Sequence, residues 1–159
     1  MYFVDQMTLT TKNWIYQNNE VTELDIEKYH GFVYLITNLI TGRKYIGKKI
    51  FKFTKKIPPL KGKKRKRTKI YESDWKLYYG SSKALLEDVE LLGADNFSRE
   101  ILSLHVSKSS WTYYEVAGQF ERDVLYACLP DETPEYYNDN ISGKFYHNAD
   151  VRELKNNKA

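Results

Sequence analysis

The sequence predicts an α+β fold in which a small central antiparallel β-sheet of about three strands is flanked by helices. Two apolar runs separated by turn residues predict a β-hairpin, and a basic insert follows it. Further along the chain, two stretches with apolar residues at helical spacing are separated by one stretch of alternating polarity. A length of 159 residues suits one domain that can bury a core.

The hairpin is the first element expected in the chain. Its two runs are rich in Val, Ile and Tyr, and they flank a short loop that contains glycine. The runs are Phe32–Ile36 and Lys44–Ile46, and the turn residues between them are Asn38, Thr41 and Gly42. Residues 1–30 are weakly patterned, and we expect them to form a lead-in against the sheet.

Two tyrosines and a glycine make this hairpin a candidate site. Tyr34 and Tyr45 come from neighbouring strands, and Gly47 follows two residues after Tyr45. A glycine inside a strand weakens the strand, and one reason to retain it is close approach by a ligand or another backbone. Phenols beside a bare backbone suit a phosphate group. An ordinary aromatic hairpin is the alternative, because the chain contains 14 tyrosines.

Positive charge is concentrated in one segment. Residues 48–69 contain 12 of the 25 Lys and Arg residues and no Asp or Glu, whereas acidic residues exceed basic ones by eight elsewhere. Such a basic block on an acidic body predicts a polyanionic partner, nucleic acid first.

Within the basic insert at residues 52–70, Pro58 and Pro59 end any strand ladder, and the like-charged run at residues 60–69 is expected to be a flexible arm, because like charges repel. A solvated loop or a localisation-type signal is the alternative to DNA contact. The residues expected to contact DNA are Gly47, Lys48, Lys63, Lys64, Arg65, Lys66 and Arg67.

A first helix is predicted at Lys83–Leu92, between the N-cap Ser82 and a stop at Gly93. Its buried stripe is expected to consist of Leu85, Leu86, Val89 and Leu92. Lys83 lies in the first turn, where a cation opposes the helix dipole, so it is not placed for helix stability. A role toward phosphate would explain it, and an ordinary surface lysine is the alternative.

A third strand is predicted at Asn96–Leu104 and a long second helix at Trp111–Leu129. At about 100° per residue, Glu121 falls inside the apolar arc of that helix, whereas Glu115 falls on its polar side. A buried carboxylate must be paired, neutral or bound to a cation. Glu121 is therefore a candidate metal ligand, and a salt bridge at the rim of the core is the alternative.

The hairpin residues resemble those of the GIY-YIG nuclease family, whose hairpin carries a Gly-Ile-Tyr triplet and a Tyr-Ile-Gly triplet. The second triplet is intact at residues 45–47, whereas the first reads Phe-Val-Tyr and matches only at Tyr34. The order of the later elements is also similar, with Glu121 as the family glutamate and Tyr137-Asn138 as the terminal pair. The run at residues 78–102 resembles the phage Seg-type, homing-like endonucleases.

The resemblance implies a nuclease domain at residues 31–141 and a flexible tail at residues 142–159. Two features depart from the family pattern. The arginine expected shortly after Tyr-Ile-Gly is absent, so Lys49, Lys83 or a residue of the arm would have to supply the cation. The gap between the glutamate and the asparagine is long, which leaves Glu115 as an alternative metal ligand.

The residues and the resemblance together imply a metal-dependent DNA endonuclease with one active site per chain. A single Mg²⁺ held by Glu121 would act as a Lewis acid, since magnesium needs only one or two carboxylates. Tyr34 or Tyr45 would activate water, and a lysine would have to lower the phenol's pKa from about 10, Lys49 being the nearest in sequence. Asn138 would orient the scissile phosphate or the second tyrosine.

The expected partner is double-stranded DNA, bound by a monomer or by a DNA-induced dimer. A cytoplasmic location is expected, because the chain has one cysteine, no run long enough to cross a membrane and no apparent signal peptide. A non-catalytic nucleic-acid-binding protein is the main alternative, and an RNA-associated structural protein is another. The first alternative explains the uneven charge, but not the tyrosines, Gly47 and Glu121 together, and the second has little beyond the basic isoelectric point in its favour.

Overall fold

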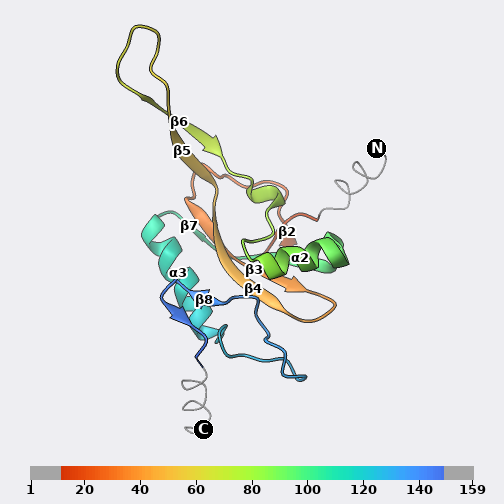
Figure 1. The fold of residues 1–159 in the computed structure, drawn as a ribbon. Coiled ribbons are helices and arrows are strands. Elements are labelled where there is room, and N and C mark those ends of the chain that lie inside the picture. The colour runs from red at the N-terminus through yellow and green to blue at the C-terminus, as the bar shows by residue number, and fades with distance from the viewer. Residues whose placement is uncertain (1–11, 149–159) are drawn as a thin grey trace.

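The computed structural model describes residues 12–148, and Figure 1 shows their arrangement. A five-stranded mixed sheet lies at the centre, with strand order β2-β1-β7-β3-β4. Its strands are β1 (Ile15–Tyr16), β2 (Asn19–Glu20), β3 (Gly31–Asn38), β4 (Lys44–Ile50) and β7 (Phe97–His105). The α+β class is confirmed. An antiparallel sheet of three strands is wrong, because β1 and β2 extend the sheet and β1 runs parallel to β7.

The predicted hairpin is confirmed as β3 and β4, which pair antiparallel along their length. The side chain of the buried Asn38 closes the turn, because its Oδ1 accepts the backbone N–H groups of Ile40 and Thr41. Gly42 has φ +84°, a conformation that L side chains rarely adopt. The predicted third strand is confirmed as β7, which pairs with the other side of β3 and leaves β4 at the edge of the sheet.

Strands occupy both ends of the basic insert, and the second strand begins at Arg67, inside the arm expected at residues 60–69. The expectation of a flexible arm over all of residues 60–69 is therefore wrong. Strands β5 (Lys52–Ile57) and β6 (Arg67–Glu72) pair antiparallel over all their residues. Their ladder ends at the pair Ile57–Arg67, since the two prolines that follow have no N–H to donate. The β5–β6 hairpin extends away from the body of the molecule, with the loop of residues 58–66 at its tip (Figure 1).

The first helix, α2 (Lys83–Leu92), has the predicted bounds. The Oγ of Ser82 accepts the N–H of Leu85 at 3.3 Å, and Gly93 ends the helix with φ +94°. Leu85 is fully buried as expected, but Leu86 is 43% exposed and does not belong to the buried stripe. Short 3₁₀ turns precede and follow α2 at η1 (Trp75–Leu77) and η2 (Ala94–Asn96).

The second helix is shorter than predicted. Helix α3 (Lys108–Glu121) ends at the C-cap Arg122 and does not continue to residue 129. The next residue, Asp123, has φ +55°, and a left-handed residue interrupts a right-handed helix. Residues 124–128 therefore lie outside the helix. A helical wheel that includes them assigns the wrong buried face to α3.

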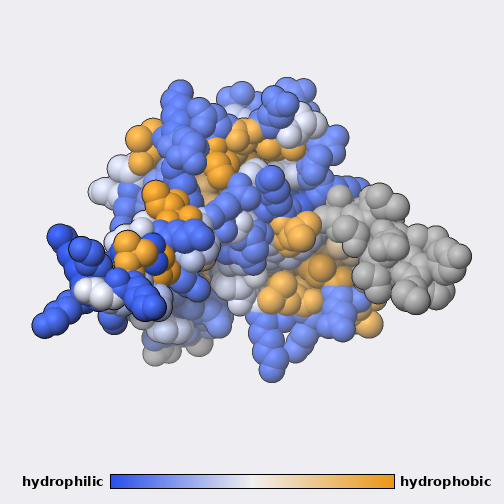
Figure 2. Space-filling model, turned by 90° about the horizontal axis from the view of Figure 1, so that it is seen from above, coloured by the Kyte–Doolittle hydropathy of each residue, from blue (hydrophilic) through white to orange (hydrophobic). Residues whose placement is uncertain are grey.

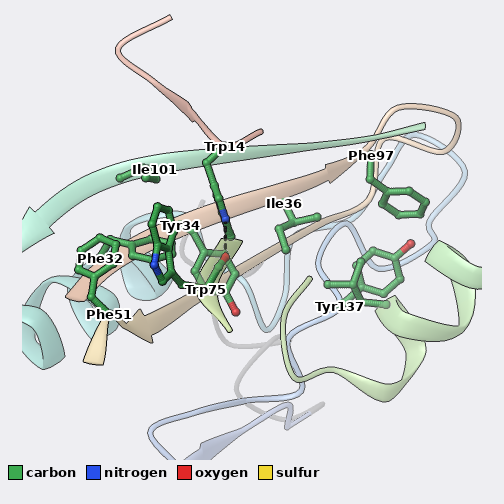
Figure 3. Close-up of a cluster of buried hydrophobic side chains, with 10 residues drawn as sticks. Trp14, Phe32, Tyr34, Ile36, Phe51, Trp75, Phe97, Ile101 and Tyr137 are labelled. Atoms are coloured by element: carbon green, nitrogen blue, oxygen red, sulfur yellow. Dashed lines mark hydrogen bonds between the residues drawn. The ribbon is translucent and has the colours of Figure 1, made fainter. Parts of the chain in front are cut away.

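Two clusters of buried side chains hold the sheet between α2 and α3. One cluster contains Tyr34 from β3 and Leu85 from α2, and aromatic rings dominate it (Figure 3). In it, the Trp14 indole donates a hydrogen bond of 2.7 Å to the backbone oxygen of Trp75. The second cluster lies on the opposite face, where Val33 packs with Trp111 from α3. The indole of Trp111 donates to the backbone oxygen of Phe32, which fixes α3 on the sheet.

The last described segment returns along β4 and then forms a small hairpin of β8 (Asn140–Ile141) and β9 (Phe145–Tyr146). Residues 142–148 of the expected tail therefore have defined structure, and residues 149–159 lie outside the described part. Within residues 12–148, no helix has the length and apolar character required to cross a bilayer. Viewed from above, the surface is mostly hydrophilic, with hydrophobic residues in several separate clusters (Figure 2).

Candidate active site

The candidate site is built around the outer edge of β4. Residues 135–138 run alongside this strand: the N–H of Lys44 donates to Glu135, and the N–H of Tyr137 donates back to Lys44. The side-chain amide of Asn138 then makes the two backbone hydrogen bonds to Ile46 that a neighbouring strand would otherwise make. Its Oδ1 accepts the N–H of Ile46 at 3.0 Å, and its Nδ2 donates to the oxygen of Ile46 at 2.8 Å. Asn138 thereby fixes the strand segment that lies between Tyr45 and Gly47.

Tyr45 lies at the rim of this edge, with its phenol facing a groove. The hydroxyl is 3.0 Å from the Oγ of Ser81, the residue before the N-cap of α2. Burial raises the pKa of Tyr45, and the hydrogen bond to Ser81 lowers it by a smaller amount. The phenol is therefore neutral at pH 7, and the expected lowering of its pKa by a lysine is wrong for this structure.

Tyr34 shares the sheet face of Tyr45 but lies behind it. The two rings are 6.1 Å apart between centroids, and Tyr34 is only 1% exposed. Burial raises the pKa of Tyr34 well above its ordinary value, so this phenol also stays neutral.

The close approach that requires Gly47 is made by the protein itself. Gly47 pairs with Tyr34, and a Cβ at Gly47 would lie 2.7 Å from the Tyr34 Cζ and 3.0 Å from the Tyr45 Cε1. The Tyr34 phenol therefore covers the backbone that was a candidate for phosphate contact. Gly47 is buried, and its role is to admit the two rings.

Glu115 reaches the groove from α3, on the other side of the sheet. Its carboxylate is 3.9 Å from the Lys48 ammonium, and only 17% of its side chain is exposed. Burial raises the pKa of Glu115, while the charge and backbone N–H of Lys48 lower it by less. Lys48 also lies 4.3 Å above the Trp111 ring and donates to Thr112, so it is held by α3.

Gln119 lies one turn after Glu115 on the same side of α3. Its Nε2 donates to the backbone oxygen of Ile46 at 3.1 Å, which joins it to the Asn138 bonds. Its Oε1 is buried without a hydrogen-bond partner among the described residues. A buried oxygen left without a donor is costly, so this atom is a candidate acceptor for a cation or an ordered water.

Two neighbouring pockets join these groups into one groove. Tyr45, Ser81, Asp139 and Asn140 line both of them. The first pocket adds residues of α2 and the segment beside it, including Lys83, Glu87 and Tyr137. The second adds Glu115, Gln119, Asn138 and Ser142. Tyr45 therefore stands between a side with an exposed ammonium and a side with a buried carboxylate.

The expected placement of Glu121 is wrong. Glu121 is the last residue of α3, is exposed, and lines neither pocket. The exposed residues of α3 also include large aromatic side chains, Tyr113 and Tyr114 among them, while the polar Gln119 is buried. The helix thus presents aromatic residues outward, and the carboxylate that α3 brings to the groove is that of the alternative, Glu115.

The basic residues that could replace the missing family arginine lie in different parts of the structure. Lys83 is exposed and borders the groove beside Tyr45. Lys49 points to the same sheet face as Tyr45, but its ammonium is 2.6 Å from Asp74 and 3.9 Å above the Tyr78 ring. Lys63, Lys64, Arg65, Lys66 and Arg67 are exposed at the end of the β5–β6 hairpin and line neither pocket.

Several groove residues were not predicted as site residues, and Ser81, Asp139 and Gln119 are three of them. Ser81 reads as a turn residue, and Asp139 carries no motif in the sequence. Gln119 has one usable signal, because Trp111, Glu115 and Gln119 are spaced by four residues and share one side of a helix. Taking Trp111 as the anchor of the buried face would have selected Glu115 and Gln119 and rejected Glu121.

In a comparison with known protein families, residues 14–141 match the family model described as "Putative endonuclease segE, GIY-YIG domain". The matched region begins next to β1 and ends with β8, so it contains the whole five-stranded sheet, both helices and all of the groove residues named above except Ser142. Comparison with curated proteins and with solved structures gave no match. The chain therefore belongs to the SegE-type GIY-YIG endonucleases, which are nuclease hydrolases.

Proposed function

We propose that this chain is a magnesium-dependent endonuclease that hydrolyses phosphodiester bonds of DNA at one active site per chain. The observation that carries the proposal is the groove around β4, where Tyr45 from one face of the sheet and Glu115 from the other line the same pocket. Hydrolysis at phosphorus needs groups on both the entering and the leaving side of the phosphate. A site that wraps around a strand edge can provide both.

The donor set suits one magnesium ion. Among residues 12–148, no group of three or more His, Cys, Asp or Glu side chains could hold a metal. Magnesium is usually bound by one or two carboxylates and keeps several waters, so such a group is not required. The Glu115 carboxylate and the unpartnered Oε1 of Gln119 would hold the hydrated ion. When bound, the ion would act as a Lewis acid and stabilise the leaving 3′ oxygen.

Tyr45 would orient the attacking water. Its phenol oxygen can accept a hydrogen bond from that water while its own O–H donates to Ser81. As the water oxygen bonds to phosphorus and the P–O3′ bond breaks, the water must lose a proton. That proton would go to the phenolate form of Tyr45, toward which the Ser81 hydroxyl can donate. Because the pKa of Tyr45 is raised, this form is scarce but strongly basic, so the rate should rise with pH.

The remaining groups would position the substrate and the other residues. Lys83 is the best replacement for the missing family arginine, because it borders the groove and its ammonium is exposed toward solvent. Lys49 is engaged by Asp74, which disfavours it for this role. Asn138 would act through its two bonds to Ile46, holding β4 at the distance from α3 that the site needs.

The test is cleavage of labelled duplex DNA by Glu115→Gln, with Glu121→Gln as the matched control on the same helix. Loss of the metal-binding carboxylate should lower the cleavage rate by about a thousandfold. Binding of DNA should persist, and Glu121→Gln should cleave like the wild type. The reverse pattern would contradict the assignment of Glu115. A wild-type protein that binds DNA but never cleaves it with Mg²⁺ would favour the non-catalytic alternative.

A further inference from the structure

The β5–β6 hairpin has two different faces. Side chains alternate along a strand, and the cross-strand pairs place Phe53 with Tyr71, Lys55 with Lys69, and Ile57 with Arg67 on one face. We call this the Lys55 face. The opposite face carries Lys52, Thr54, Lys56, Thr68, Ile70 and Glu72. The Lys55 face has three cations and no acid, whereas the opposite face ends in a Lys52–Glu72 pair near the body.

The cations of the Lys55 face are unneutralised. Lys55 and Lys69 are directly opposite each other, an arrangement that destabilises a strand pair. Among the described residues, the salt bridges of β5 and β6 involve only Lys52, which pairs with Glu27. The rings of Phe53 and Tyr71 stack with centroids 5.8 Å apart and lie under the ammoniums of Lys55 and Lys69. Cation–π contacts thus hold the ammoniums along the face without removing their charge.

The dimensions of the hairpin match one groove of duplex DNA. Six paired residues give a ribbon roughly 20 Å long, with two strands about 4.8 Å apart. The major groove of B-form DNA is about 12 Å wide and admits a two-stranded ribbon without deformation, whereas the minor groove is only about 6 Å wide. The loop at the tip adds exposed cations that would meet the phosphates beside the groove.

We propose that the β5–β6 hairpin enters the major groove of double-stranded DNA with the Lys55 face toward the base edges. This inference rests on the proposed function and specifies its substrate as B-form duplex. Arg67, Lys55 and Lys69 carry donors that suit the O6 and N7 acceptors of guanine. The loop cations would bind phosphate and set the position of the ribbon without reading sequence.

The test compares Lys55→Glu with Lys56→Glu in the Glu115→Gln background, so that binding is measured without cleavage. Lys55 and Lys56 are adjacent and both exposed, and they differ in the face they occupy. Lys55→Glu should weaken duplex binding at least tenfold more than Lys56→Glu. Lys55→Ala and Lys56→Ala, which reverse no charge, should show the same order. Equal losses for both members of each pair would overturn the proposal.

Chemical footprinting identifies the groove. Bound protein should protect guanine N7, in the major groove, from methylation by dimethyl sulfate, and Lys55→Glu should remove that protection. Protection of adenine N3 instead would place the ribbon in the minor groove and overturn the proposal. Duplex RNA should bind at least tenfold more weakly, because its major groove is too narrow for side chains to read. Equal affinity for duplex RNA would also overturn it. Mg²⁺-dependent cleavage by the wild type is measured separately, so a failure of the major-groove proposal can be told apart from a failure of the proposed function.

Discussion

The groove beside β4 and the β5–β6 hairpin are both polar, but they hold their polar groups in different ways. In the groove, Asn138 makes two bonds to Ile46, and Glu115 is mostly buried beside Lys48. On the hairpin, the cations are exposed and rest on aromatic rings. The groove therefore holds its polar side chains in fixed positions, whereas the hairpin supplies exposed positive charge. Changes in the groove should therefore alter the rate at saturating DNA, and changes in the hairpin should alter affinity.

The largest effect is expected for Tyr45 in the groove, where a substitution should lower the cleavage rate without changing the affinity for DNA. Tyr45→Phe should lower the single-turnover rate by about a hundredfold to ten-thousandfold, because the water loses its orienting and proton-accepting oxygen. Affinity for DNA should change little, since the ring remains in place.

The pH profile provides a second measurement on the same variant. The pKa of Tyr45 is raised above its ordinary value, so the phenolate fraction stays small and grows about tenfold per pH unit between pH 7 and 9. The wild-type rate should rise with that slope, and Tyr45→Phe should lose it. A Tyr45→Phe protein with the wild-type rate and slope would transfer the water-activating role to Lys83 or Lys49.

The second effect tests the hairpin side of the comparison. Replacing Lys63, Lys64, Arg65, Lys66 and Arg67 by Ser should weaken DNA binding by about a hundredfold at physiological salt. It should also reduce the slope of log affinity against log salt by up to about four. Each phosphate contact releases about 0.9 of a counterion on binding, and this release is lost with the contact. The rate at saturating DNA should change little. A collapsed rate would mean that one of these five residues replaces the missing family arginine.

The smallest effect tests whether Gly47 serves packing. Gly47→Ala places a methyl group against the Tyr34 ring, and such overpacking should cost about 1–3 kcal/mol of unfolding free energy. The control is Gly118→Ala in α3, where a Cβ would have only an ordinary contact at 3.5 Å and helix propensity would gain about 1 kcal/mol. Thermal unfolding should rank the wild type between these variants. Wild-type stability for Gly47→Ala would contradict the contact with Tyr34.

Local patterns predicted much of this fold. The hairpin, α2 with both its caps, and β7 follow from turn residues, capping residues and alternation, all of which act within a few residues. The β5–β6 hairpin could not be predicted in this way. Its second strand is polar and basic, and its pairing is held by cross-strand rings far apart in the sequence.

The candidate site was predicted in part, for a related reason. Tyr45, Lys83 and Asn138 line the groove, and their sequence signals are local motifs. The choice between Glu121 and Glu115 required knowledge of where α3 ends and which face it buries. That face is set by the Trp111 indole bonding to Phe32, a contact across 79 positions of sequence. Hydrophobic periodicity cannot contain this information, because aromatic residues occupy the exposed face as well.

The return of residues 135–138 along β4 has a consequence for how the enzyme is made. Ile46 and Asn138 are 92 positions apart, so their contact closes a long loop, and the groove needs the whole stretch of chain between the two residues. A nascent chain that ends before Asn138 can form the β3–β4 hairpin. It lacks the two hydrogen bonds between the Asn138 side chain and Ile46, and the edge of β4 is not fully covered. The groove is therefore assembled only after Asn138 has been synthesised, and the same segment that completes it protects the open edge of β4 from pairing with another chain.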